Sequence, residues 1–449
     1  MKFLSFILCV LMAGASACAQ SKKAARNAAK FQNIMIAEAK QGDPYGPCEP
    51  TICVNLKNTN QIAAGAILNR YYWSEDGGRQ WQAGKLSSDY GVFGDPVIIA
   101  DWKGNFYYAH LSDPEKGGWS SEKLLDRIAL EKSTDGGKTY AQSAFMGMRH
   151  PKDQDKHWLC ADPKTHALIC SWTEFDKYDS KDTVRDRSRI LFSRSDDGGK
   201  TWADAISINQ YDGDCLDGDN TPEGAVPAFG PNGEVYVAWS WNNKIWFDRS
   251  LDGGKTWLPQ DIVVADQPGG WAFDIPGITR CNGMPVLVCD LSNGPNRGTL
   301  YVNWADQRNG THDTDVFFAK STDGGKTWSK AQRVNDDPAG KHQFLTWMAI
   351  DQTNGYLYFM FYDRRKAGND AKTEVYLAVS QNGGKTFKNM KVSANAFEPN
   401  EDVFFGDYNH ISAHDGIIRP IWTRMDGKKL SIWTAIIDFK NPPIIDNQD

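Results

Sequence analysis

The stretch Ser74-Glu75-Asp76-Gly77-Gly78-Arg79-Gln80-Trp81 occurs six times in this chain in closely similar form. The other copies lie at residues 133–140, 195–202, 250–257, 321–328 and 380–387, the last with Asn382 in the acidic position. Successive acidic positions are 55 to 71 residues apart. A short unit that recurs this regularly over most of a chain predicts a repeat architecture.

The chemistry of this stretch suits the tip of a β-hairpin. An Asp or Asn side chain accepts hydrogen bonds from N–H groups of its own turn. The paired glycines permit positive φ, and the final aromatic residue covers the turn with apolar surface. We therefore expect the six acidic positions to be structural rather than catalytic.

The segments around each copy predict four antiparallel strands per unit. In one unit these are residues 286–290, 300–304, 316–320 and, after the repeat, 332–335. Four-stranded antiparallel units in series are typical of an all-β propeller. Residues 402–437 add three more strands without a repeat, and residues 31–37 add one at the other end. We predict seven blades, the last closed by the N-terminal strand, with six blades as the alternative.

The repeat resembles the Asp-box (BNR) repeat of the sialidase superfamily, and the resemblance covers nearly the whole chain after its first segment. Sialidases of this superfamily have six blades. The resemblance implies a site at the funnel mouth, which is the central opening on the face opposite the boxes. It also implies a nucleophilic Tyr at the start of the last innermost strand, activated by a Glu, and Tyr408 and Glu223 occupy comparable places. Sialidases grip the substrate carboxylate with three arginines, the first in an Arg-Ile-Pro motif. The comparable position reads Cys48-Glu49-Pro50 here, so the arginine set is incomplete.

The loops expected at the funnel mouth contain acids, histidines, arginines and tryptophans together. Carboxyl groups perform the acid–base work of glycoside hydrolysis, and aromatic faces stack on sugars. The catalytic candidates are Tyr408, Asp407, Glu223 and Asp95. The substrate-binding candidates are Arg280, His157, His342, Trp271, Arg365 and Arg424.

These residues favour an exo-acting glycoside hydrolase acting on a glycan or glycoconjugate. The incomplete arginine set disfavours sialic acid and leaves uronic acids, neutral sugars or lyase chemistry open. The alternative is a non-catalytic propeller that binds a glycan or a protein at the cell surface. A net charge of −6 without a basic block argues against a nucleic-acid partner.

One acidic loop offers a candidate Ca²⁺ site, although the proposed chemistry requires no cofactor. Hard carboxylate ligands in a glycine-containing loop suit Ca²⁺, but the spacing does not match an EF-hand. The candidate ligands are Asp212, Asp214, Asp217 and Asp219. The alternative is a solvated acidic loop.

The first nineteen residues read as an export signal, with Lys2 before an apolar run at residues 3–12 and small residues at 13–19. Two processing routes fit. Cys18 follows Ala15-Ser16-Ala17 as in a lipobox, while ordinary cleavage near Ala19 suits the same residues. We expect an exported protein that is periplasmic, secreted or anchored at the surface through Cys18, with a tether at residues 20–31 before a single propeller domain at 32–449.

Seven cysteines follow Cys18, and an oxidising compartment favours pairing among them. The candidate disulfides are Cys160 with Cys170, across a hairpin, and Cys215 with Cys281, from equivalent long loops. The alternative is that the cysteines are buried as small apolar residues.

Overall fold

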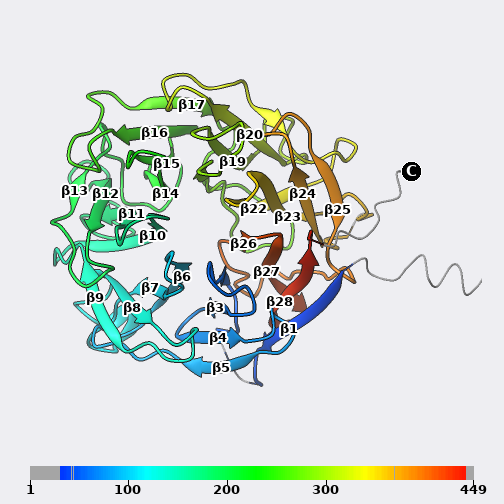
Figure 1. Cartoon of the computed structure of the whole chain (residues 1–449), viewed down its shortest axis with the longest axis horizontal. Helices are drawn as coiled ribbons and strands as arrows, with labels where there is room; N and C mark the ends of the chain where they lie inside the picture. Colours follow the sequence, from blue (N-terminus) through cyan, green and yellow to red (C-terminus); the bar gives the residue numbers. More distant parts are fainter. Residues whose placement is uncertain (1–30, 42, 44, 369, 441–449) are drawn as a thin grey trace, which may run out of the picture.

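The computed structural model describes residues 31–41, 43, 45–368 and 370–440. Seven four-stranded antiparallel sheets form a ring, with their innermost strands facing a common axis (Figure 1). The prediction of a seven-bladed propeller is therefore confirmed, and the six-bladed alternative is wrong. Among the described residues, the one helical element is a 3₁₀ turn at Gly118–Ser120, and no helix is long and apolar enough to cross a membrane. The predicted export signal and Cys18 lie outside the described residues.

Each blade runs from the axis outward in chain order. The first consists of β2 (Thr51–Val54), β3 (Ile62–Ala66), β4 (Arg70–Ser74) and β5 (Gln82–Lys85). The second consists of β6 (Gly94–Ala100), β7 (Phe106–Leu111), β8 (Ile128–Ser133) and β9 (Gln142–Met146). The third consists of β10 (Asp153–Ala161), β11 (Leu168–Phe175), β12 (Ser188–Ser195) and β13 (Ile206–Ser207). The fourth consists of β14 (Glu223–Phe229), β15 (Val235–Trp241), β16 (Lys244–Ser250) and β17 (Ile262–Asp266).

The remaining blades follow the same order until the last strand. The fifth consists of β18 (Val286–Cys289), β19 (Leu300–Asp306), β20 (Asp315–Ser321) and β21 (Gln332–Arg333). The sixth consists of β22 (Gln343–Asp351), β23 (Tyr356–Asp363), β24 (Glu374–Ser380) and β25 (Lys388–Lys391). The seventh consists of β26 (His410–His414), β27 (Ile417–Asp426), β28 (Lys429–Asp438) and, at its outer edge, β1 (Gln32–Glu38).

The seventh blade closes the ring by joining the two ends of the described chain. Strand β1 pairs antiparallel with β28, so that Gln32 lies opposite Ile436 and Glu38 opposite Ser431. Figure 1 shows the two strands side by side at the rim. The N-terminal strand supplies the fourth strand that the C-terminal segment lacks, as the sequence predicted.

The repeated stretch forms the turn between the third and fourth strands of each blade that carries it. In the fourth blade, Asp252 Oδ1 accepts hydrogen bonds from the N–H groups of Lys255 (3.0 Å) and Thr256 (2.9 Å). Ser250 Oγ donates to the same carboxylate at 2.6 Å. The acidic position therefore stabilises the turn, as its chemistry predicted.

The second glycine of the turn lets adjacent blades approach each other closely. Gly254 has φ +98°, and a Cβ there would lie 2.4 Å from the ring of Phe192 in the preceding blade. Gly325 meets Phe247 in the same way, at 2.2 Å. A side chain at either position would push two blades apart, so the repeat serves packing between blades as well as the turn itself.

Aromatic side chains fill the axis of the ring. Trp158 of β10 and Trp347 of β22 lie against each other with ring centroids 4.1 Å apart, although they belong to the third and sixth blades. Tyr408 and His410, from the seventh blade, contact Trp158 at centroid distances of 5.7 and 5.3 Å. We call these four side chains the axial plug; all are buried.

The seven cysteines of the described residues are all free, which corrects both proposed disulfides. Cys160 lies opposite Ile169, and Cys170 lies opposite Leu159. The two cysteines are thus one register position apart, and side chains alternate between the faces of a strand, so they point to opposite faces. Cys215 and Cys281 are each buried and unbonded. Five of the seven described cysteines are buried and Cys53 and Cys160 are half-buried, so the alternative of cysteines packed as small apolar residues describes the structure better.

Candidate functional site

A cluster of charged side chains lies at the axis, where the innermost strands begin. Lys156 Nζ lies 3.2 Å from Asp95 Oδ2 and 2.9 Å from Asp407 Oδ2. These residues come from the third, second and seventh blades. Because the third and seventh blades are not neighbours, a contact between them places the cluster at the centre of the ring.

A distortion of the backbone accompanies the charged side chains of the first three blades. Glu49, Asp95 and Lys156 have φ of +49°, +47° and +49°. The pairing register shifts at the same place, between Gly94 and Val97 and between Asp155 and Trp158. A bulge redirects side chains at the end of a strand, and strained backbone of this kind is often found at functional sites.

Arg280, in the loop before β18, joins two of the acids. Its Nε donates to Asp407 Oδ1 at 2.8 Å, its Nη2 makes a second contact with the same carboxylate, and its Nη1 lies 3.1 Å from Asp217 Oδ2. Tyr178 Oη donates to Asp217 Oδ2 at 2.6 Å. The Asp407 N–H donates to Glu49 Oε1 at 3.2 Å, which ties the first blade to the seventh.

The charges of the cluster do not balance unless some carboxyl groups stay protonated. Six carboxyl groups gather around two cations, Lys156 and Arg280. The carboxyl groups are those of Glu49, Asp95, Asp155, Asp217, Glu223 and Asp407. We call these eight side chains the axial charge cluster.

The environment separates the pKa values of these carboxyl groups. Burial, and then the charge of Asp217, raises the pKa of Glu223 well above its usual range. Burial opposes ionisation of Asp217, but Lys156, a hydrogen bond with Glu223 and Arg280 together lower its pKa. Both carboxyl oxygens of Glu223 are buried without a donor, whereas Asp217 accepts hydrogen bonds from Tyr178 and Arg280, so Glu223 is the acid of the two and Asp217 is the carboxylate.

Of three further carboxyl groups, one is held neutral, one titrates near neutral pH and one is held ionised. Burial, and then the charges of Asp95 and Asp407, raises the pKa of Glu49 well above its usual range. Burial raises the pKa of Asp155 to about 7. Burial opposes ionisation of Asp407, but Lys156 and Arg280 lower its pKa to about 2. Protonated and ionised carboxyl groups therefore lie side by side, which is the arrangement that acid–base catalysis uses.

Access to the cluster is confined to one edge. The side chain of Arg280 is 40 % exposed, those of Asp95 and Asp217 are 12 % and 11 % exposed, and Asp407 is 2 % exposed. Arg280, Asp95 and Asp217 therefore form the surface that a ligand meets first, and Asp407 holds Lys156 and Arg280 in place behind it.

The structure places Tyr408 in the axial plug. Its Oη donates to the Pro96 carbonyl at 3.2 Å, and its ring packs edge-on against Trp158. Burial, and then the charges of Asp95 and Glu49, raises the pKa of Tyr408 well above its usual range. Glu223 interacts with Asp217 instead. These surroundings keep the Tyr408 proton in place, which is the opposite of what a tyrosine nucleophile needs.

Of the other candidates, Arg280 lies in the cluster and five residues do not. Trp271 is 3 % exposed and covers Gly224, so it packs in the core. Arg365 pairs with Asp363 and Asp336, and Arg424 pairs with Asp426. Burial lowers the pKa of His157 and of His342 to about 4, and His342 Nδ1 lies 3.0 Å from Thr314 Oγ1.

The four candidate Ca²⁺ ligands interact with separate partners. Asp212 pairs with Arg189, Asp214 accepts from Thr221, Asp217 belongs to the cluster, and Asp219 accepts from the N–H of Ala272. Among the described residues, no group of three or more His, Cys, Asp or Glu side chains is placed to hold a metal ion.

Sequence reasoning missed Lys156 and Tyr178 and did not select Glu49 or Asp155 for the site. Lys156 lies beside Asp155 at the start of an innermost strand, which is the position that selected Asp95. Tyr178 lies in a polar loop without any local motif. The signal that could have found Glu49, Asp155 and Lys156 is a charged residue near the start of an innermost strand. This signal applies to every blade rather than to the last one alone.

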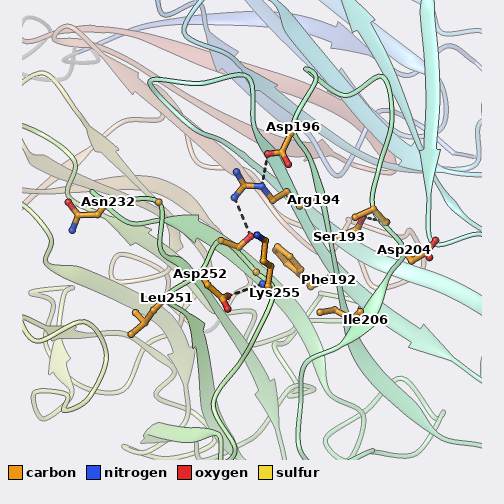
Figure 2. A pocket seen from close by; sticks show the side chains of 14 residues that line it. Phe192, Ser193, Arg194, Asp196, Asp204, Ile206, Asn232, Leu251, Asp252 and Lys255 are labelled. Atoms are coloured by element: carbon orange, nitrogen blue, oxygen red, sulfur yellow. Dashed lines mark hydrogen bonds and ion pairs between the residues drawn. The ribbon is translucent and has the colours of Figure 1, made fainter.

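A separate cavity of about 500 Å³ lies between β12 and the Asp-box turn of the fourth blade (Figure 2). Arg194 crosses it, with Nε 2.7 Å from Asp196 and Nη1 donating to the Gly253 carbonyl at 3.2 Å. Asp252, also in its wall, holds its own turn. The polar groups of this cavity thus serve the junction between two blades. The cavity lies at the opposite end of the strands from the charge cluster.

Comparison with known proteins agrees with the turn geometry. A family model described as BNR/Asp-box repeat matches residues 319–330. This match contains the copy at residues 321–328, and the other five copies share its sequence pattern. A sialidase of Bacteroides fragilis (strain YCH46) is 24% identical over 311 residues, which make up 64% of this chain and 52% of that protein. The chain thus spans about half the length of the curated relative that it matches.

Solved structures share the propeller fold. A polysaccharide lyase, the PL25 ulvan lyase bound to -[GlcA(1-4)Rha3S]-, is 11% identical with a TM-score of 0.54, over 91% of this chain and 96% of that chain. An α-L-arabinanase of Penicillium chrysogenum is 13% identical with a TM-score of 0.49, over 92% and 99% of the two chains. At 11% identity, the likeness to the lyase shows the fold alone.

Proposed function

We propose that this chain is an exported glycan-active enzyme, an exo-acting glycoside hydrolase whose site is the exposed edge of the axial charge cluster. The observation that carries this proposal is the pair of Glu223 and Asp217, one protonated and the other ionised, at the edge where Arg280 meets solvent. A carboxylic acid that keeps its proton at neutral pH is the group that protonates a glycosidic oxygen. The sialidase name of the curated relative supports the same class of reaction.

In this proposal the pair of Glu223 and Asp217 protonates the leaving group, and Asp95 serves the attack on the sugar. Glu223 passes its proton to the ionised Asp217, which is the more exposed of the two and delivers the proton to the glycosidic oxygen. Asp95, also at the exposed edge, acts as base or nucleophile. Lys156 and Asp407 are positioning residues, because Lys156 orients Asp95 and is itself held by Asp407.

The charge of the cluster favours a neutral or amino sugar as the substrate. Both cations of the cluster are already paired: Lys156 with Asp95 and Asp407, and Arg280 with Asp407 and Asp217. A sugar carboxylate would have to displace one of these buried partners and leave it unpaired, which costs several kcal/mol, roughly 3 to 5. We therefore infer that sialic and uronic acids are poor substrates.

The test is a hydrolysis screen of the full chain with matched variants. The panel contains aryl glycosides of neutral hexoses, pentoses, hexosamines, glucuronic acid and sialic acid. We expect release from a neutral or amino sugar, and a loss of at least about a hundredfold in Glu223→Gln and Asp95→Asn. Tyr408→Phe is expected to stay active, because the hydroxyl contacts only the Pro96 carbonyl among its hydrogen-bond partners.

Each other result contradicts part of the proposal. One such result is that the original chain releases sialic acid and Tyr408→Phe does not, although circular dichroism shows that the variant is folded. This result would establish a tyrosine nucleophile and refute the assignment to Asp95. Activity that survives both carboxyl variants would place the chemistry elsewhere.

A second candidate function is a non-catalytic propeller that binds glycans. The observation that favours it is the burial of the cluster, since Glu49, Glu223 and Asp407 are at most 3 % exposed and their roles are explained by holding blades together. Absence of hydrolysis across the panel, combined with glycan binding, would select this function.

A further inference from the structure

An exposed aromatic platform lies beside the axial charge cluster, on a connection of the second blade. Residues 112–127 link β7 to β8, and the 3₁₀ turn Gly118–Ser120 within them carries Trp119. The side chain of Trp119 is 68 % exposed although it is one of the largest apolar groups in the chain. Such exposure at a loop that leads to a site indicates a contact surface for a ligand.

Two aromatic neighbours hold Trp119 in a fixed orientation. Phe93 meets its ring edge-on at a centroid distance of 5.5 Å and 90°, and Tyr178 lies 5.7 Å away at 31°. The turn itself is fixed, because Asp113 accepts hydrogen bonds from the N–H groups of Gly117 (3.3 Å) and Gly118 (2.8 Å). The indole is therefore preorganised to receive a flat apolar surface.

Trp119 forms one wall of a cavity of about 690 Å³. The cavity has aromatic and polar walls: Tyr45, Ser88, Phe93, Asp113, Lys116 and Trp119. Tyr45, also in the wall, is 57 % exposed. A volume in the range of roughly 300 to 1,000 Å³ with aromatic walls and a few polar groups is typical of small-ligand sites.

The platform is joined to the charge cluster through both of its aromatic neighbours. The hydroxyl of Tyr178 donates to Asp217 at 2.6 Å. Phe93 is two residues before Asp95 in the chain and lies immediately before the same innermost strand, β6. Trp119 is thus separated from Asp217 of the cluster by one side chain, that of Tyr178.

We propose that Trp119 is the stacking platform of a second sugar-binding subsite, which takes the unit of a neutral oligosaccharide adjacent to the unit in the charge cluster. A pyranose ring has an apolar face that matches the indole and hydroxyl groups that match Asp113, Lys116 and Ser88. A loop of a protein ligand could also pack on Trp119, but it would not require the acids of the cluster beyond Tyr178. The surroundings of Trp119 therefore favour a sugar over a protein ligand. The inference rests on the proposed function only for what binds in the cluster itself.

The experiment measures how binding depends on the length of the glycan. An array displays neutral tetrasaccharides and, for each, the monosaccharide that forms its terminal unit. The tetrasaccharides include cellotetraose, maltotetraose, xylotetraose and lacto-N-neotetraose. The full chain is compared with Trp119→Ala, with Trp119→Phe and with Tyr211→Ala. Tyr211 is the matched control, because it is 47 % exposed and stacks on another aromatic ring, Trp241, in the fourth blade. Calorimetry then measures the best tetrasaccharide and its monosaccharide.

We expect the tetrasaccharide to bind at least about tenfold more tightly than its monosaccharide, as one well-packed aromatic contact allows. Trp119→Ala should reduce this advantage to about twofold or less, Trp119→Phe should keep part of it, and Tyr211→Ala should keep all of it. Binding of no tetrasaccharide, or an advantage that survives Trp119→Ala, overturns the subsite. A protein ligand recovered in place of glycans overturns it as well.

The same samples separate this inference from the proposed hydrolase. Length-dependent binding without release of sugar would leave the subsite standing and refute the hydrolase. Release of sugar without dependence on length or on Trp119 would do the reverse.

Discussion

Lys156 and Asp407 form an ion pair of 2.9 Å between the third and seventh blades. Both side chains are buried, at 6 % and 2 % exposure, and Lys156 also contacts Asp95 of the second blade. Burial opposes the charge on Lys156, but Asp155, Asp95 and Asp407 raise its pKa well above its usual value. One ammonium group thus compensates acids from three blades at the point where they meet.

Lys156→Met is expected to destabilise the propeller by about 3 to 5 kcal/mol, because it leaves Asp95 without its cation and Asp407 with Arg280 alone. Urea unfolding followed by circular dichroism measures the loss. Lys181→Met is the matched control, since Lys181 pairs with Asp179 on the surface, with both side chains more than half exposed. That change should cost less than about 0.5 kcal/mol, and a similar loss in both variants would show that the buried pair contributes nothing special.

Asp155→Asn should change how stability depends on pH. Burial raises the pKa of Asp155 to about 7 from an ordinary value near 4, so the folded state binds its proton more tightly than the unfolded state. The stabilisation from this proton is complete below about pH 4 and is lost as the pH rises toward 7. The amide cannot ionise and lacks this loss.

The free energy of unfolding of Asp155→Asn, relative to the original chain, should therefore rise steadily between pH 4 and 7. Chemical unfolding at several pH values measures the difference. A difference that stays flat across this interval would mean that Asp155 ionises normally in the folded protein.

Trp158→Ala should open a cavity in the axial plug and cost about 3 to 5 kcal/mol, the usual range for removing a large buried aromatic side chain. Trp158→Phe should cost less because it retains a ring against Trp347. Trp119→Ala, which removes an exposed tryptophan, should cost less than about 0.5 kcal/mol. Thermal unfolding compares the three, and equal losses at positions 158 and 119 would contradict the packing of the axis.

Two neighbouring acids in the third blade should differ sharply in their effect on stability. Asp197 Oδ1 accepts the N–H groups of Lys200 and Thr201, both at 3.0 Å, whereas Asp196 makes one surface ion pair with Arg194. We expect Asp197→Ala to cost about 1 to 2 kcal/mol and Asp196→Ala less than about 0.5 kcal/mol. Neither should alter glycan binding, and a loss of binding in Asp197→Ala without a loss of stability would show that the boxes have a role beyond folding.

The fold could be predicted from the sequence because its signals are local. Asp252 binds N–H groups three and four positions away, so its role can be read from a single stretch. The blade count follows from the number of such stretches together with the unmatched strands at the two ends. The pairing of cysteines could not be read in this way, because a register difference of one residue between Cys160 and Cys170 reverses the face on which a side chain lies.

The candidate site could be predicted only in part because its contacts join distant segments. Arg280 and Asp407 are 127 positions apart, and Glu49 and Asp407 are 358 apart. Position at the start of an innermost strand selected Asp95, Glu223 and Asp407, but it does not reveal which side chains share a proton. Trp271 was instead selected wrongly. A tryptophan in a loop suggested a contact with a sugar, but this side chain lies against Gly224 in the core.

The pairing of β1 with β28 sets a condition on biosynthesis. A ribosome makes residues 32–38 before any other described strand, and their partners at 431–436 are among the last of the described chain to be made. Until then β1 has an unpaired edge, and the first six blades can form only an open arc. Assembly therefore ends with a single late event in which both ends of the polypeptide meet, and a chain truncated before β28 would expose strand edges that invite aggregation.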